Sequence, residues 1–188
     1  MLNLISVIRD IFGGNMSLKN FMKNVFGGKE TKEEKSNAVS VKAPINGKVL
    51  KLEEIKDPAF SSGMLGKGLA IDPEEGKVHS PVDGEIVMLF DTCHAVGIKS
   101  NEGVDLLIHI GMDTVELNGE GFKAHVKNGD KVKAGQDLID FDLDLIKEKG
   151  YEVVTPIVVT NLEKIKPIQY TDKDRVVVGD EIFNFELQ

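Results

Sequence analysis

Residues 92–111 read TCHAVGIKSNEGVDLLIHIG, and this stretch decides the predicted fold. Two apolar runs flank the polar tetrapeptide SNEG at residues 100–103. Apolar, β-branched runs joined by a short loop that ends in glycine are typical of an antiparallel β-hairpin. If SNEG is a four-residue loop, the register follows, and it places His94 directly opposite His109.

In that register the two imidazoles share one surface of a sheet with Val96, Ile98 and Leu107. Side chains directly opposite each other on antiparallel strands have Cβ atoms about 4.5–5.5 Å apart. No serine or acid completes a catalytic triad, but an imidazole pair suits phosphoryl transfer. A neutral imidazole nitrogen is a nucleophile near neutral pH, and a second imidazole can donate a hydrogen bond to phosphoryl oxygens. On spacing alone, two core histidines bonded to backbone carbonyls are an equal alternative.

Composition narrows the class of protein. The chain has 188 residues, enough for one domain with a substantial core, and 41% of them are hydrophobic. The formal charge of −8 disfavours nucleic-acid binding, because phosphate backbones are repelled. The single cysteine, Cys93, excludes an intrachain disulfide and fits a reducing, cytoplasmic setting. No stretch reaches the roughly 20 apolar residues of a membrane span, and a secretory signal is not predicted.

From residue 38 onward, short β-branched runs alternate with turn signals such as Asn-Gly and Asp-Gly, which indicates an all-β domain. Two pairs of segments resemble each other, residues 43–52 with 80–89 and residues 134–142 with 178–186. This order predicts two similar sheets interleaved in sequence, and we expect an antiparallel β-sandwich with internal duplication. Brief helical turns are expected near 143–149 and 162–166.

Residues 1–28 differ from the rest of the chain. Apolar residues recur there at helical spacing in two short runs, each ending in Phe-Gly-Gly. We expect an amphipathic helical tail that either contacts the inner membrane surface or frays in water. Translation from Met16 instead of Met1 would remove the first run. Residues 29–37 read as a charged linker, and residues 38–188 as the folded domain.

Several motifs point to one family. The quoted segments are SPVDG at 80–84, TCHA at 92–95, GVDLLIHIGMDTVEL at 103–117 with Gly119, Gly121 and Phe122 after it, then Val132, Gly135 and TPIVVTN at 155–161. On these residues the chain resembles the glucose-type enzyme IIA component, or EIIA type 1, of the bacterial phosphoenolpyruvate-dependent sugar phosphotransferase system. The resemblance covers residues 40–188, with a signature core at about 58–162. It implies a β-sandwich of the duplicated hybrid motif type.

The resemblance also assigns roles to residues. It implies that His109 accepts a phosphoryl group from the phosphocarrier protein HPr, as a tele-phosphohistidine. His109 would then pass the group to the cysteine of the IIB domain of a sugar permease. His94 would assist that onward donation, and the Thr92 hydroxyl would orient the site.

A docking patch for these partners is implied as well. Its expected members are apolar residues around the histidines and two rim residues: Phe60, Met64, Leu65, Phe90, Leu107, Asp113 and Val115. Leu107 stands where a well-studied enteric relative has Phe, Gly97 where it has Ser, and Met64-Leu65 where it has Ile-Val. Docking stays plausible with these differences, whereas the regulatory partners of enteric relatives, the sugar and the oligomeric state stay open.

No cofactor is required by this chemistry. A zinc ion on His94 and His109 would need a further ligand, such as a partner's carboxylate, because structural zinc sites have four ligands and catalytic sites usually three. Strand alternation points Cys93 away from His94, so a Cys-His dyad is not expected. His79 and His125 lie away from the hairpin and are expected to be ordinary surface or core residues.

Three other functions compete. A swinging-arm carrier domain fits the strand pattern of residues 126–138, but the Met-Lys-Met and Asp-Lys-Ala tripeptides of such domains do not occur in the sequence. A zinc endopeptidase of the lysostaphin type would need a His-x-His motif, whereas this chain has Gly111 at the third position. A purely regulatory binding module can coexist with phosphoryl transfer and stays open.

Overall fold

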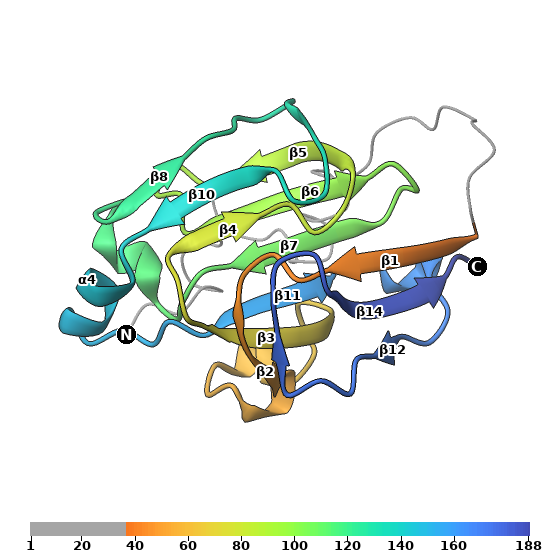
Figure 1. Ribbon diagram of the computed structural model, residues 1–188, viewed down its shortest axis with the longest axis horizontal. Coiled ribbons are helices and arrows are strands. Elements are labelled where there is room, and N and C mark those ends of the chain that lie inside the picture. Colours follow the sequence, from red (N-terminus) through yellow and green to blue (C-terminus); the bar gives the residue numbers. More distant parts are fainter. Residues whose placement is uncertain (1–36) are drawn as a thin grey trace, which may run out of the picture.

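The computed structural model describes residues 37–188. The predictions for residues 1–28 and for nearly all of the linker at 29–37 lie outside the described residues. Figure 1 shows a molecule built mainly of antiparallel strands, which confirms the predicted all-β sandwich. No helix within residues 37–188 has the length and apolar character needed to cross a membrane.

One sheet of eight strands forms the larger layer of the sandwich. Every strand pair in it is antiparallel. In spatial order its strands are β13 (Arg175–Val176), β2 (Gly47–Lys51), β3 (Lys67–Pro73), β11 (Thr155–Val159), β7 (Asp105–His109), β6 (Ala95–Ser100), β5 (Gly84–Leu89) and β9 (Lys131–Val132).

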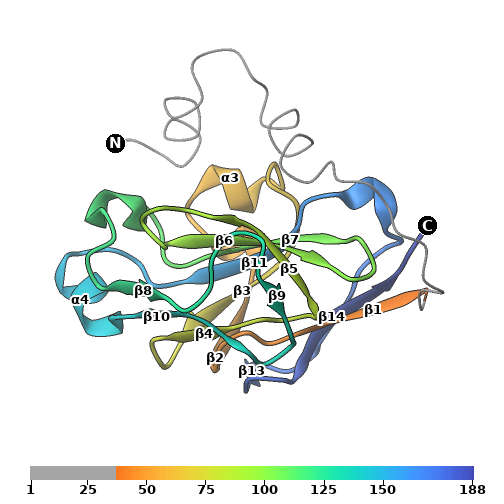
Figure 2. The same ribbon diagram turned by 90° about the horizontal axis from the view of Figure 1, so that it is seen from above.

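Two smaller sheets of three strands complete the sandwich. One has the order β1 (Ala38–Lys42), β14 (Glu181–Glu186) and β12 (Gln169–Tyr170), and the other has the order β4 (Lys77–His79), β10 (Asp137–Phe141) and β8 (Phe122–Ala124). Figure 2, seen from above, shows both on the same side of the large sheet, opposite the helix α3 (Pro58–Ser61). The large sheet therefore has an inner face toward the small sheets and an outer face toward α3.

The predicted duplication is visible in the strand order. β2 and β5 lie within the first pair of similar segments, and each is second from an end of the large sheet. β14 and β10, from the second pair, are the central strands of the two small sheets. Equivalent hydrogen bonds each join a segment of the first pair to a segment of the second: the side chain of Asn46 accepts from the amide of Val178 at 2.7 Å, and the side chain of Asp83 accepts from the amide of Ala134 at 2.8 Å.

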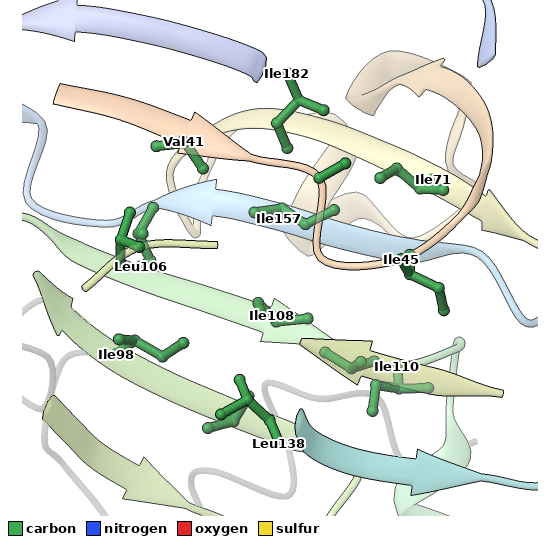
Figure 3. Close-up of a cluster of buried hydrophobic side chains, with 14 of the residues drawn as sticks. Val41, Ile45, Ile71, Ile98, Leu106, Ile108, Ile110, Leu138, Ile157 and Ile182 are labelled. Carbon is green, nitrogen blue, oxygen red and sulfur yellow. The ribbon is translucent and has the colours of Figure 1, made fainter. Parts of the chain in front are cut away.

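The main core lies between the inner face and the small sheets. Figure 3 shows its aliphatic side chains, including Val41, Leu106, Ile108 and Leu138, gathered from strands of all three sheets. A second apolar cluster lies on the outer face, where the side chains alternate with those of the main core. It is covered by α3 and by the 3-10 helix η1 (Leu52–Glu54) and comprises Leu52, Ile55, Ala59, Phe60, Leu65, Ala70, Ala95, Leu107, Met112 and Val158.

Both predicted helical turns are confirmed, as α4 (Leu143–Glu148) and η3 (Leu162–Lys164). Within residues 37–188 three further short helices were not predicted: η1, α3 and η2 (Thr114–Leu117). A signal for α3 exists in the sequence, since Asp57 caps the helix by accepting a hydrogen bond from the amide of Ala59, and proline follows it at the first helical position.

The hairpin register differs by one residue from the prediction. Ala95, not His94, pairs with His109. The loop has three residues, 101–103, because Ser100 and Val104 bond across it at 2.8 Å and Gly103 adopts the left-handed φ of 88°.

The corrected register also changes which side chains share a face. A slip of one residue moves a strand's side chains to the opposite face. Val96 and Ile98 therefore belong to the main core and not to the surface that carries the histidines, while Leu107 stays on the outer face with His109. The predicted placement of Val96 and Ile98 beside the histidines was wrong.

Candidate active site

His109 is the last residue of β7 and lies on the outer face of the large sheet. Its ring centroid is 5.4 Å from that of Phe60, which α3 places over the sheet. Its Nδ1 atom lies 2.7 Å from the backbone oxygen of Gly111. A carbonyl oxygen only accepts, so Nδ1 carries the proton and Nε2 keeps a free lone pair.

His94 reaches the same place without being a cross-strand partner. It precedes β6, and Cys93 before it has a left-handed φ of 56°, so regular strand alternation does not hold there. The His94 backbone oxygen accepts a hydrogen bond from the amide of Ile110 at 2.8 Å. The ring centroids of His94 and His109 are 5.0 Å apart at an interplanar angle of 81°. The predicted imidazole pair is therefore confirmed, although the register from which it was derived was wrong.

Two neighbours orient the His94 ring. The Thr92 hydroxyl hydrogen-bonds with His94 Nδ1, and the Phe90 ring lies 5.0 Å away, centroid to centroid. The other ring nitrogen, Nε2, is buried and has no hydrogen-bond partner within residues 37–188. A buried polar atom without a partner is costly, which marks this nitrogen as a point where a ligand can bind.

Burial keeps both rings neutral. Burial, and to a lesser extent the neighbouring His109, lowers the pKa of His94 from its usual 6.5 to about 3. Burial lowers the pKa of His109 to about 4, against the opposing effects of the hydrogen bond to Gly111 and the charge of Asp57. A ring that stays neutral through the physiological range has its lone pair available as a nucleophile at pH 7.

The apolar residues of the expected docking patch divide into two groups. Phe60, Leu65 and Leu107 are 1%, 5% and 5% exposed and belong to the second cluster, so they support the site from beneath. These three side chains therefore leave little surface for a partner: Phe60 lies within α3, and Leu65 and Leu107 pack in the same cluster. Met64 is 61% exposed, and Phe90 is half-buried.

The two rim residues flank the start of η2. Val115 is half-buried, and Asp113 is the half-buried residue that precedes the helix, with a left-handed φ of 57°. Burial, together with the charges of Asp57 and Glu116, raises the pKa of Asp113. These mutually repelling carboxylates give the surroundings of the site an acidic character that favours a basic partner.

Other candidate residues lie elsewhere. The rings of His79 and His125 lie 3.2 Å and 2.7 Å from carboxylate oxygens of Asp137 and Asp140, beside the small sheet β4–β10–β8. The Cys93 sulfur is directed at the backbone oxygen of Asp91. Within residues 37–188 no group of three or more His, Cys, Asp or Glu side chains could hold a metal. The zinc prediction for the histidine pair therefore still needs a partner's ligand.

Sequence reasoning missed the residues that fix His109. Gly111 was read only as a motif position, although its carbonyl holds the ring, and Phe60 was named as a docking residue without the helix α3 that places it beside His109. A glycine two residues after a histidine at a strand end is a usable signal, because its free conformation lets its carbonyl turn back toward the ring.

Comparisons with known proteins agree with this geometry. Residues 39–165 match the family described as phosphoenolpyruvate-dependent sugar phosphotransferase system, EIIA 1. The chain belongs to this family. A PTS system glucose-specific EIIA component from Bacillus cereus is 52% identical over 150 residues, covering 79% of this chain and 88% of that protein.

Two further EIIA relatives extend the comparison. The PTS system beta-glucoside-specific EIIBCA component of Bacillus subtilis is 53% identical over 124 residues, which are 66% of this chain and 20% of that protein. The solved structure of glucose permease IIA from Mycoplasma capricolum superimposes with a TM-score of 0.74 at 37% identity, over 79% of this chain and 96% of that one. The chain is thus a glucose-type EIIA component, a phosphotransferase of the sugar phosphotransferase system.

Proposed function

We propose that this EIIA component relays a phosphoryl group from HPr to the IIB domain of a sugar permease through His109. The observation that carries the proposal is the neutral imidazole pair, with Nδ1 of His109 held by a carbonyl and Nε2 left unprotonated. Phosphoryl transfer depends chiefly on positioning and on stabilising charge. The fixed ring of His109 supports the first, and a hydrogen bond from His94 to the phosphoryl group would contribute to the second.

In the first step, Nε2 of His109 attacks phosphorus while the phosphorus–nitrogen bond of phospho-HPr breaks. In the second step, the thiolate of the IIB cysteine attacks and the bond to Nε2 breaks, so that His109 returns to its neutral state. If the Thr92 hydroxyl donates to Nδ1 of His94, the His94 proton sits on Nε2. That nitrogen, which lacks a partner within residues 37–188, would donate to a phosphoryl oxygen.

The fused relative supports the second partner. In the beta-glucoside-specific EIIBCA component, the segment similar to this chain is part of one polypeptide with B and C components. Two sites that exchange a phosphoryl group gain effective concentration when they are linked. We infer that this chain meets a permease of the same type at the cytoplasmic face of the membrane, and contact of residues 1–28 with that membrane stays a prediction.

Reconstitution tests the relay. The full chain is incubated with labelled phosphoenolpyruvate, enzyme I and HPr, then with a glucose-type permease that contains the IIB domain. We expect an acid-labile, base-stable phosphate on the chain that disappears when permease and sugar are added. Absence of label with HPr present would refute the relay. Label that never leaves the chain would instead favour the purely regulatory module.

A further inference from the structure

The tautomer of His109 depends on where one backbone carbonyl points. The Gly111 oxygen lies 2.7 Å from Nδ1 and takes the ring proton, so that Nε2 keeps its lone pair. Gly111 has a left-handed φ of 71°. The loop from Ile110 to Asp113 contains a second left-handed residue, Asp113, and its conformation must therefore be imposed by its neighbours.

Both ends of this loop are tied to other elements. The amide of Ile110 donates to the backbone oxygen of His94, and the amide of Met112 donates to the backbone oxygen of Glu152, each at 2.8 Å. Glu152 also forms an ion pair with Lys56, next to α3. The first bond fixes the His109–Ile110 peptide, and the second fixes the Gly111–Met112 peptide, which carries the Gly111 carbonyl. Neither bond fixes the Ile110–Gly111 peptide between them.

Thr114 contacts this peptide with both of its γ substituents, the hydroxyl and the methyl group. Its hydroxyl donates a hydrogen bond to the Ile110 oxygen, and its side chain is completely buried. A Cβ atom on Gly111 would lie 2.5 Å from the Thr114 methyl carbon and 2.7 Å from the Glu152 oxygen. Thr114 and Glu152 thus hold Gly111 from two sides, one by a hydroxyl and a methyl and the other by backbone.

We propose that Thr114 is a positioning residue for the relay: its hydroxyl fixes the Ile110–Gly111 peptide, and this peptide, together with the Gly111–Met112 peptide held by Glu152, keeps Gly111 in the left-handed conformation that directs its carbonyl at Nδ1 of His109. Without the hydroxyl the Ile110–Gly111 peptide can rotate, which changes the conformation of Gly111 and moves its carbonyl away from Nδ1, so that one tautomer is no longer selected. A ring with its proton on Nε2 cannot attack phosphorus through that nitrogen. The catalytic consequence rests on the proposed function, whereas the effect on the tautomer does not.

Three variants of the full chain distinguish the effect of the Thr114 hydroxyl from that of its methyl group. Thr114→Ser keeps the hydroxyl, Thr114→Ala lacks it, and Thr114→Val replaces it with a methyl of similar size. Long-range ¹H–¹⁵N spectra of histidine-labelled protein report the His109 tautomer directly. We expect Thr114→Ala and Thr114→Val to shift the tautomer ratio of His109, Nδ1–H to Nε2–H, about tenfold toward Nε2–H. This factor corresponds to the net strength of one neutral hydrogen bond. Ser should keep the ratio of the parent chain.

The rate of phosphate uptake from phospho-HPr is measured beside the spectra and should fall by about the same factor in Ala and Val. If Thr114→Val fails to fold, the comparison of Thr114→Ser with Thr114→Ala still decides whether the hydroxyl controls the tautomer. An unchanged tautomer ratio in Ala, even with a lower melting temperature, would overturn the proposal and leave Thr114 a purely structural residue. If the parent chain takes up no phosphate at all, the relay fails, but the spectra still decide the role of Thr114.

Discussion

At the residue scale, the chemistry of the site follows from taking two imidazoles out of water. Burial lowers the pKa of His94 to about 3 and that of His109 to about 4, so both are neutral in the folded chain at pH 7. The unfolded chain binds protons at these rings from about pH 6.5 downward. Their contribution to stability is therefore fully present above pH 6.5 and is lost as the pH falls toward 4. Asp105, whose pKa burial raises to about 6, acts in the opposite direction and offsets part of the loss.

We predict that neither ring of the pair titrates between pH 8 and pH 5. Carbon-bound ring protons of His94 and His109 should keep constant chemical shifts over that range in the full chain, because protonation would place a charge in a buried site. An ordinary histidine would be about nine-tenths protonated at pH 5.5. A midpoint near 6.5 for either ring would show that the site is open to water and that burial does not control its protonation.

The two steps of the relay, phosphate uptake and phosphate donation, should respond differently when His94 is changed. We predict that His94→Gln still takes up phosphate but passes it to the IIB cysteine about a hundredfold more slowly. A glutamine amide donates a hydrogen bond but cannot take a proton as charge shifts during donation. Single-turnover measurements of the two half-reactions check this. Equal slowing of uptake and donation would mean that His94 only packs against His109.

At the element scale, the hairpin β6–β7 shows what a sequence pattern can and cannot settle. The apolar runs and the glycine predicted the hairpin, but the loop length could not be read from them, because three-residue and four-residue loops both accept glycine at the end. Three residues put Ala95 opposite His109. The imidazoles still meet, because the chain turns at Cys93, a conformation that strand periodicity does not foresee.

The corrected loop makes a stability prediction. Gly103 has a φ of 88°, so Gly103→Ala should cost about 1 kcal/mol of unfolding free energy, whereas Gly103→Asn should cost less, since asparagine tolerates this conformation better. Urea denaturation measures both variants. Phosphate uptake is expected to stay the same, because the loop is at the far end of the hairpin from His109. Equal stability of the two variants would argue against the left-handed residue.

Membership of the second apolar cluster distinguishes side chains that stabilise the site from exposed side chains that a partner can contact. Leu107 is 5% exposed beneath α3, so Leu107→Asp should lower the unfolding free energy by about 3 kcal/mol or more through an unpaired buried charge. Met64 is 61% exposed, and Met64→Asp should change stability by no more than about 0.5 kcal/mol.

Thermal melts beside transfer assays distinguish the two roles. Met64→Asp should slow transfer from HPr and to the permease without moving the melting temperature, because a charge is placed on a surface that partners must cover. Met64→Leu is the matched control and should transfer at the normal rate. Normal transfer by Met64→Asp would remove this residue from the docking surface.

At the scale of the whole molecule, the duplication was the most predictable feature. The two pairs of similar segments became equivalent strands, and even the hydrogen bonds from Asn46 and Asp83 repeat. The short helices over the outer face were less predictable, because α3 and η1 are four and three residues long and are stabilised by burial of Phe60 and its neighbours more than by local propensity. Burial of Phe60, Leu65 and Leu107, which were expected in the docking patch, could not be foreseen without these helices.

The central claim is that Nε2 of His109 carries the phosphoryl group, and one spectrum tests it most directly. The full chain, charged by phosphoenolpyruvate, enzyme I and HPr, is observed by ³¹P NMR with histidine labelled with ¹⁵N in the ring. We predict a single phosphohistidine signal coupled to Nε2, present in His125→Ala and absent in His109→Ala. A phosphohistidine signal that persists in His109→Ala, or one coupled to Nδ1, would contradict the account.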